Sequence, residues 1–322
     1  MVQRLNPEDT MGGPLAYLAV AGGATLFSGL IVGSRALSQR GFSLYEISLM
    51  GGLVTALAFG GLLAMRADLR PRRRDWGLFL AYGAVGAVLQ LSQFGSIVLG
   101  VPIALIGLLL YTQPIWTLVF GRILLAEPVT GRKLGALGLA AAGTLVLFQP
   151  GASSLDHSWV GMLSALIAGV MISLWLILAR LSGLRGNAPI TTAFAYTASS
   201  STILLVAWPF LRLGSGVAEW SRLSPEPFLV HWQLVALYTL FANLVPMILV
   251  NWGVRRIDMT AAGLLLLVEP VAAAWAAYLV FGEAVGESIW LGGTLILGAN
   301  LVLLGAHKGV TRGSSTGRSK VA

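Results

Sequence analysis

The sequence is a succession of apolar segments about twenty residues long, separated by short polar turns. A bilayer core about 30 Å thick takes roughly 20 residues of α-helix to cross. Applying that length predicts ten membrane helices, at 13–34, 44–65, 76–98, 102–122, 133–149, 159–180, 189–211, 231–253, 259–281 and 287–306. Only Gly100, Val101 and Pro102 separate the third segment from the fourth, which leaves one kinked helix as an alternative there.

Composition places the chain in a membrane rather than in water. Hydrophobic residues make up 56% of the 322 positions and charged residues only 11%, whereas a soluble protein carries about 25% charged residues. The chain has no cysteine, which excludes disulfides, thiolate metal sites and cysteine nucleophiles. Its histidines, His157, His231 and His307, fall at or beyond the ends of apolar runs. We therefore expect no metal, no cofactor and no catalytic residues.

The basic residues indicate how the chain is oriented. With both termini placed in the cytoplasm, the predicted cytoplasmic segments hold 17 of the 21 Lys and Arg residues, and the external segments hold four. Basic loops are retained on the cytoplasmic side during insertion, so this distribution supports an even number of helices. The net charge of +8 is thus a topology signal with some attraction to anionic lipid, and we do not expect nucleic acid as a partner.

Two stretches of the chain spell almost the same phrase. At 107–115 the sequence reads GLLLYTQPI, and at 263–271 it reads GLLLLVEPV. A shift of 156 residues gives 11 identities in the 45 positions from 104 to 148 without a gap. The matching leucines mean little in so apolar a chain, but each copy also has a proline and a glutamate thirteen residues apart. The chain is therefore predicted to contain two related halves.

These halves are predicted to be five-helix repeats of opposite orientation, because five is odd and the second copy enters the membrane from the other side. The expected fold is an all-α polytopic membrane protein with ten transmembrane helices in two inverted-topology repeats. We place the first repeat at 1–150, the second at 151–309, and a disordered cytoplasmic tail, rich in Gly, Ser and basic residues, at 310–322. Inverted repeats around a midplane site are a transporter architecture.

The later part of each half carries a resemblance to a known family. From residue 114 the chain reads PIWTLVFGRILLAEPVTGRKLGALGLAAAGTLVLF, and from 269 it reads EPVAAAWAAYLVFGEAVGESIWLGGTLILGANLVLL. This order of proline, apolar run, glutamate and Gly/Ala/Leu-rich helix resembles the EamA-type modules of the drug/metabolite transporter superfamily. Within it, the chain looks most like the bacterial exporters of aromatic and other amino acids. The resemblance implies a multi-pass inner-membrane protein with ten helices and cytoplasmic termini that exports small metabolites.

Polar and aromatic side chains inside the predicted helices indicate where a substrate binds. Polar groups in hydrocarbon cost several kcal/mol unless they are paired, so they turn toward protein or a wet cavity. Aromatic walls with amide and hydroxyl groups suit an amphipathic zwitterion. The residues expected to bind substrate are Phe27, Ser28, Phe79, Tyr82, Gln90, Gln93, Trp175, Asn243, Asn251 and Glu269. The alternative is that single Ser, Thr and Asn residues only bond neighbouring helices.

Glu269 is the only acid well inside a predicted helix. A charged carboxylate buried alone there is costly, so we expect it to bind a substrate ammonium group or to carry a proton. The alternative is a neutral carboxyl bonded to a carbonyl that Pro270 frees. The matching residue of the first half is Gln113, so the charge is not required in both halves.

Pro114 and Pro270 each remove a backbone hydrogen bond and predict a kink near the middle of the membrane. Either the kink flexes and gates the two mouths, or it is a fixed bend in the packing. Glu127 and Glu283 fall at helix ends, where we expect each to cap the start of the next helix.

The predicted function is secondary transport, not catalysis: export of aromatic and other neutral amino acids by alternating access. The chain has no GxxxxGK[ST] motif of an ATPase, and no histidine base lies mid-span for an intramembrane enzyme. Export or facilitated passage of other amphipathic metabolites or cationic drugs is the alternative, and coupling to protons or to the substrate gradient is open. The expected partners are an amino-acid substrate and the bilayer. Gly29 and Gly33 form a GxxxG pair more typical of close packing than of dimerisation, which favours a monomer.

Overall fold

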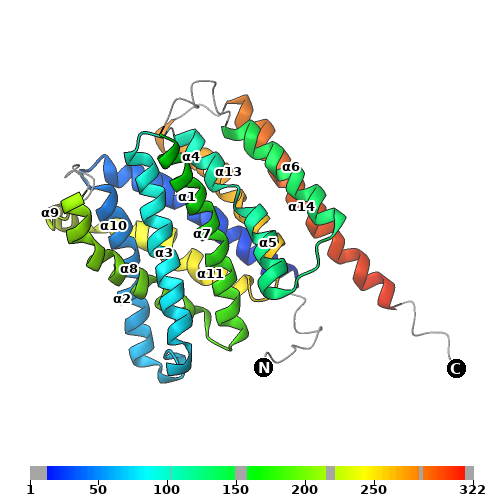
Figure 1. The fold of residues 1–322 in the computed structure, drawn as a ribbon, viewed down its shortest axis with the longest axis horizontal. Helices are drawn as coiled ribbons and strands as arrows, with labels where there is room; N and C mark the ends of the chain where they lie inside the picture. Colours follow the sequence, from blue (N-terminus) through cyan, green and yellow to red (C-terminus); the bar gives the residue numbers. More distant parts are fainter. Residues whose placement is uncertain (1–12, 102, 149–157, 215–221, 283–285, 316–322) are drawn as a thin grey trace.

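The structure, a computed structural model, describes residues 13–101, 103–148, 158–214, 222–282 and 286–315, and its regular structure is entirely helical (Figure 1). Its elements are α1 (Pro14–Ser38), α2 (Leu44–Met65), the short turns η1 (Ala67–Leu69) and η2 (Arg73–Asp75), α3 (Trp76–Val98), α4 (Ile103–Leu110), α5 (Gln113–Leu125), α6 (Gly131–Phe148), α7 (Trp159–Leu184), α8 (Pro189–Gly214), α9 (Glu226–Val230), α10 (Trp232–Tyr238), the π-helical η4 (Thr239–Leu244), α11 (Val245–Gly253), α12 (Met259–Leu266), α13 (Val268–Phe281) and α14 (Glu287–Ser315).

Within the described residues, eight helical spans are long and apolar enough to cross a membrane. They coincide with eight of the ten predicted segments, seven of them to within four residues, while the third span, Ala67–Val98, begins before the predicted residue 76. The other two segments correspond to α6 and to the shorter apolar part of α14, Glu287–Val302. Gly100, at φ +76°, separates α3 from α4, so these are two helices rather than one. The chain is an all-α membrane protein, and a count of ten crossings stays a prediction.

Local chemistry sets where several helices begin and end. Ser43 accepts the Glu46 N–H while the Glu46 carboxylate accepts the Ser43 N–H, a reciprocal capping box that starts α2. Asp258 starts α12 by accepting two N–H groups of its first turn. Gly282, at φ +69°, ends α13 in the left-handed conformation that a side chain disfavours.

Two membrane helices are broken near their middle. The fourth predicted helix is divided into α4 and α5 at Tyr111 and Thr112, and the ninth is divided into α12 and α13 at Leu267. Pro114 and Pro270 lie in the first turn after each break, where a proline removes no helical hydrogen bond. The predicted kinks are therefore complete breaks. Their action as hinges stays a prediction.

The two halves pack in matching ways. Helix α3 packs on α7 as α11 packs on α1, and α4 and α5 pack on α7 as α12 and α13 pack on α1. Equivalent helices of the two halves also pair directly, α2 with α8 and α6 with α14, and the second pair runs side by side in Figure 1. This exchange of partners is what two repeats related by a twofold axis would produce.

Small residues allow these close contacts. Gly33 of α1 faces the Tyr238 ring with no room for a Cβ, and a Cβ on Gly29 would lie 3.1 Å from the Ala242 side chain. The GxxxG pair thus packs inside the chain, as predicted. Where α6 crosses α14, a Cβ on Gly292 would lie 2.6 Å from the Gly143 carbonyl oxygen, so the two backbones touch.

The predicted tail differs in part from the structure. Helix α14 continues to Ser315, so residues 310–315 are helical rather than disordered. Residues 316–322 and the predicted repeat boundary at 150–151 lie outside the described residues. The division into repeats at 1–150 and 151–309 therefore stays a prediction.

Candidate substrate site

Four aromatic side chains from four helices meet in the largest apolar core. Phe27 of α1 lies against Trp175 of α7, with ring centroids 6.1 Å apart and planes inclined at 73°. Tyr196 of α8 lies 6.1 Å from Trp175 and 4.8 Å from Tyr82 of α3. All four side chains are buried. We call them the aromatic cluster. Such tilted and edge-to-face pairs orient one another and form a firm apolar wall.

Buried polar atoms without partners mark the same region. Gln113 Oε1 and Asn251 Oδ1 have no hydrogen-bond partner among the described residues. The Tyr82 hydroxyl and the Trp175 Nε1 lie near each other and bond no other described group. Leaving a buried polar atom unpaired costs about 1–3 kcal/mol, which makes a group of them unusual in a folded chain. The Tyr82 hydroxyl proton and the two amide oxygens are therefore available to a ligand.

The structure brings together some of the predicted substrate residues. Phe27, Tyr82 and Trp175 meet in the aromatic cluster. Phe79, one turn before Tyr82, is also buried, and its carbonyl accepts a hydrogen bond of 3.1 Å from the Ser199 hydroxyl. The predicted face of α3 therefore lies at the core in its first two turns.

Ser28, Asn251 and Asn243 have different hydrogen-bond partners and lie in different parts of the bundle. The buried Ser28 hydroxyl donates to a carbonyl of its own helix at 2.6 Å. Asn251 is fully buried, and its amide lies 3.8 Å from the sulfur of Met247, which belongs to the same core as the aromatic cluster. Asn243 lies instead in η4 facing α2, where its amide bonds the Tyr238 carbonyl at 3.4 Å.

Gln90 and Gln93 lie farther along α3, away from the aromatic cluster. Phe79 and Tyr82 belong to a buried face of α3, whereas Gln90 and Gln93 are half-buried. The predicted polar face of α3 thus runs from buried positions at Phe79 and Tyr82 to half-buried positions at Gln90 and Gln93.

Basic side chains gather at one end of the bundle, which we call the basic end. It holds Lys133, Arg180, Arg185 and Arg255, which bond the connections between helices there. All eight residues of α12 are buried at this end. Its counterpart at the opposite end, α4, has half-buried residues at 107–109. The two matching helices are therefore buried to different extents.

Glu127 does not cap the helix that follows it, so that prediction was wrong. Thr130 caps α6 by accepting the Lys133 N–H at 3.3 Å. The Glu127 carboxylate crosses to the second half and accepts the Met259 N–H, with oxygen distances of 3.1 and 3.0 Å. It therefore sits at the positive N-terminus of α12. Glu283 lies outside the described residues.

The two helix breaks face each other between the halves. Gln113 of the first break is buried, its carbonyl accepts the Ser173 hydroxyl at 2.8 Å, and its amide lies 3.3 Å from the Thr117 hydroxyl. Gly263 of α12 packs directly on Gln113 and Thr117. Glu269 of the second break is half-buried and within electrostatic range of Tyr111 in the first.

Glu269 lies near the middle of the span Met259–Phe281, as expected, and there it is in the first turn of α13. A helix start carries free N–H groups and a positive partial charge, which lowers the cost of a carboxylate. The break in the helix therefore lowers the cost of placing an acidic side chain at this depth. Among the described residues, no group of three or more His, Cys, Asp or Glu side chains could hold a metal ion.

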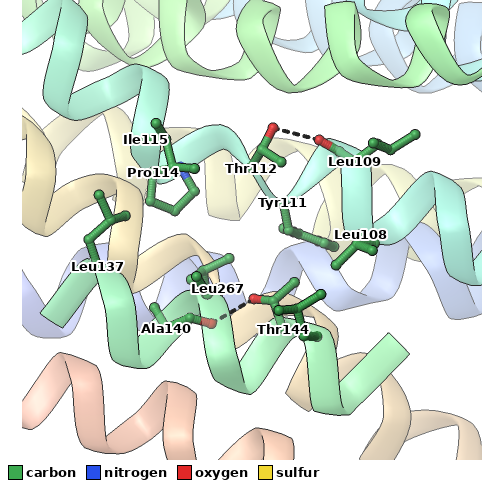
Figure 2. Close-up of a pocket in the computed structure, with 12 residues that line it drawn as sticks. Leu108, Leu109, Tyr111, Thr112, Pro114, Ile115, Leu137, Ala140, Thr144 and Leu267 are labelled. Carbon is green, nitrogen blue, oxygen red and sulfur yellow. Dashed lines mark hydrogen bonds between the residues drawn. The ribbon is translucent and has the colours of Figure 1, made fainter. Parts of the chain in front are cut away.

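A cavity of about 290 Å³ lies beside the first break (Figure 2). Its lining residues are Leu108, Leu109, Tyr111, Thr112, Pro114, Ile115, Leu137, Ala140, Ala141, Thr144, Leu145 and Leu267. The walls are nearly all apolar, and the Thr112 and Thr144 hydroxyls bond carbonyls of their own segments at 2.7 and 2.9 Å. Of the predicted site residues only Pro114 lines it, so this cavity is distinct from the aromatic cluster.

Sequence reasoning missed Tyr196 and its neighbour Ser200. The Ser200 hydroxyl is buried without a partner, and both side chains press on Gly86 of α3. A signal was present, because residues 196–202 read YTASSST within an apolar span. That density of hydroxyl groups is more than bonding to neighbouring helices requires.

Comparisons with known proteins bear on this arrangement. The EamA-like transporter family matches the chain twice, over residues 14–149 and 159–305. An uncharacterized transporter of Archaeoglobus fulgidus is 23% identical over 284 residues, covering 87% of this chain and 94% of that protein. A probable terminal-alkyne amino-acid exporter of Streptantibioticus cattleyicolor is 25% identical over 313 residues, covering 93% and 95%.

The fold is also found in a solved crystal structure. That structure superimposes with a TM-score of 0.69 at 19% identity, covering 89% of this chain and 96% of the other. Two family matches on one chain agree with the matching packing of its two halves. The chain belongs to the EamA-like transporter family.

Proposed function

We propose that this protein is a secondary transporter that exports aromatic and other neutral amino acids across the bacterial inner membrane. Membership of a transporter family supports the class of function. The S. cattleyicolor relative, a probable terminal-alkyne amino-acid exporter, supports the class of substrate. The observation that carries the proposal is the aromatic cluster with unpaired polar atoms around it.

The chemistry of these groups matches a zwitterion with an apolar side chain. The Tyr82 hydroxyl and the Trp175 N–H are donors suited to a carboxylate. The unpaired oxygens of Gln113 and Asn251, together with the Glu269 carboxylate, are acceptors suited to an ammonium group. The rings would contact the apolar side chain. Phe79 and Ser28 would support this wall, while Gln90, Gln93 and Asn243 would line the path to it.

Transport would proceed by alternating access between two inverted five-helix repeats, with both termini in the cytoplasm. The breaks before Pro114 and Pro270 would act as hinges, because a broken helix bends there without losing further hydrogen bonds. The absence of native cysteine allows a direct test of orientation. A cysteine at Gln39 should react with an impermeant maleimide outside the cell, and one at Ala67 only after the membrane is opened. The reverse pattern would refute the orientation.

The substrate assignment is tested with purified protein in liposomes and labelled phenylalanine, methionine and threonine. Tyr82→Phe removes only the buried hydroxyl and should lower the exchange rate about tenfold, the loss of one hydrogen bond to a charged group. Tyr278→Phe is the matched control, because that tyrosine is 46% exposed on α13. Equal rates in the two variants would remove Tyr82 from the site.

A carrier is distinguished from a channel or facilitator by counterflow. External unlabelled substrate should accelerate the loss of preloaded label, because a carrier returns faster when loaded. If no amino acid crosses faster than in empty vesicles, the substrate class is wrong. Cationic drugs and other amphipathic metabolites are then the classes to assay.

A further inference from the structure

Two carboxyl groups from different halves of the chain share one helix start at the basic end. Glu127, in the connection between α5 and α6, accepts the Met259 N–H through both oxygens. Asp258 caps the same helix through the N–H groups of Thr260 and Ala261, at 3.0 and 3.3 Å. The two carboxyls therefore bond consecutive N–H groups of one helix start and lie beside each other there. Two carboxyls held side by side disfavour double ionisation, so one of them tends to keep a proton.

Each carboxyl has its own cation. Lys133 of α6 lies 2.6 Å from Asp258, and Arg180 of α7 lies 3.8 Å from Glu127. Arg180 is also held by the Val254 carbonyl at 3.3 Å and by the Ile257 carbonyl. The side chains of Glu127 and Arg180 are only 11% and 13% exposed. The cluster therefore joins α5, α6, α7 and α12 across both halves in a nearly dry place.

The remaining polar groups around this cluster point elsewhere or are uncharged. Tyr17 of α1 lies within electrostatic range of Asp258, and Arg122 of α5 is exposed. In the connection before α12, Arg255 bonds the carbonyls of Asn187 and Asn251, and Arg256 stacks on the Trp252 ring. The proton balance of the cluster is therefore set by its two carboxyls with Lys133 and Arg180.

The pKa values of the two carboxyls are shifted in opposite directions. Burial, and then the neighbouring Asp258 carboxylate, raises the pKa of Glu127 from 4.5 to about 7. Burial also opposes ionisation of Asp258, but hydrogen bonds from Lys133 and Glu127 outweigh it and hold its pKa below the ordinary value. Below about pH 7 the proton therefore rests on Glu127, beside an ionised Asp258.

We propose that Glu127 and Asp258 form a proton-bound latch that keeps the basic end of the transporter closed, and that loss of the proton from Glu127 releases it. The latch spans the two halves, which must separate here for that end to open. After deprotonation, two carboxylates lie side by side at one helix start, and their repulsion opposes closure. The inference rests on the proposed alternating access but not on the identity of the substrate.

The direction of the pH effect follows from the Glu127 pKa. In the open state the carboxyl would be hydrated, with a pKa near 4.5, and in the closed state it is about 7. A proton therefore favours the closed state fully below about pH 4.5. That advantage is lost as the pH rises from about 4.5 to about 7, and above this range both states are ionised. Raising the pH over this window should open the basic end.

A single cysteine can report the opening directly in this cysteine-free chain. Ala262 is fully buried in α12 behind the latch, so Ala262→Cys should react with a charged maleimide only when the basic end opens. The rate is divided by that of Ala67→Cys, an exposed position, which removes the pH dependence of the thiol itself. The corrected rate should rise roughly tenfold from about pH 5.5 to about pH 7.5.

Variants of the latch separate its two parts. Glu127→Gln stays neutral and can still donate to Asp258, so its labelling should be slow and independent of pH. Asp258→Asn removes the ionised acceptor, so the rise should move to lower pH. Glu226→Gln, an exposed glutamate of α9, should behave like the parent.

A pH response that survives in Glu127→Gln would overturn the latch, as would faster labelling of that variant than of the parent at every pH. Melting temperatures in detergent show whether either variant is misfolded. If Glu127→Gln does not fold, the shift of the pH response in Asp258→Asn tests the latch without it. The assay needs no substrate. A normal pH response in a protein that carries no amino acid would retain the latch and reject the proposed substrate.

Discussion

The two helix breaks occupy matching positions in the two halves, yet they are held in different ways. In the first, Gln113 is buried and Ser173 of α7 bonds its carbonyl. In the second, Glu269 is half-buried, and Ser28 of α1, the helix that packs on this break as α7 packs on the first, bonds its own helix instead. The support comes from another direction, because Asn300 of α14 bonds the Leu264 carbonyl at 3.2 Å.

The difference extends to the helices that flank the breaks. A shift of 156 residues places Thr144 where the second half has Asn300. Thr144 bonds Ala140 in its own helix, and the cavity of about 290 Å³ lies beside it (Figure 2). Similar breaks thus hold a fully buried neutral amide in one half and a partly buried acid in the other. Both halves have the break, and the neighbouring side chains determine whether the polar residue at it is fully or partly buried.

The largest effect is expected when the first break is given the chemistry of the second. Gln113→Glu places a carboxylate in a buried site whose partners are Ser173 and Thr117 rather than a cation. We expect a loss of about 3 kcal/mol or more of stability, the cost of a buried unpaired charge. Thermal unfolding in detergent at neutral pH measures it, and acid should restore part of the loss. An unchanged melting temperature would mean that this break is hydrated.

The reverse exchange should affect function rather than stability. Glu269→Gln should keep the melting temperature, because this side chain is half-buried. Its exchange of labelled phenylalanine should fall about tenfold, since a hydrogen bond to a charged group is worth about 1.5–3 kcal/mol. Normal transport with the parental pH profile would show that Glu269 neither binds ammonium nor carries a proton.

The two serines provide a matched pair of smaller changes. Ser173→Ala removes the hydroxyl that bonds the Gln113 carbonyl of a different helix, and we expect a loss of about 1 kcal/mol. Ser28→Ala removes only a bond within α1, whose carbonyl keeps its helical partner, so about 0.5 kcal/mol or less is expected. Urea or thermal unfolding compares the two, and equal losses would show that the breaks are held alike.

The smallest effect should come from making the flanking helices alike. Thr144→Asn should let α6 reach the Leu108 carbonyl and fill part of the cavity, as Asn300 reaches Leu264. We expect a gain of about 0.5 kcal/mol, near the lower limit for one new hydrogen bond. Asn300→Thr, the converse, should destabilise by a similar amount. Destabilisation by both substitutions would indicate that the cavity has a different shape from that of the matching region.

Much of the fold could be predicted because it depends on local sequence. Apolar length fixed the helices to within a few residues, and the prolines marked both breaks. The aromatic cluster was predicted in part, since Phe27, Tyr82 and Trp175 stood out within apolar runs. Tyr196 was missed because its contacts come from α3 and α7, which are far from it in the chain.

The sequence by itself determined an all-α chain with two related halves, because bilayer thickness and the need to satisfy every backbone group leave an apolar segment one structure. Only the tertiary structure decided which polar groups meet. Glu127 bonds the start of α12 rather than α6, and Gln113 is fully buried while Glu269 is only partly buried. The physical reason is that the cost of a buried charge depends on partners brought by packing, and local pattern carries no information about them.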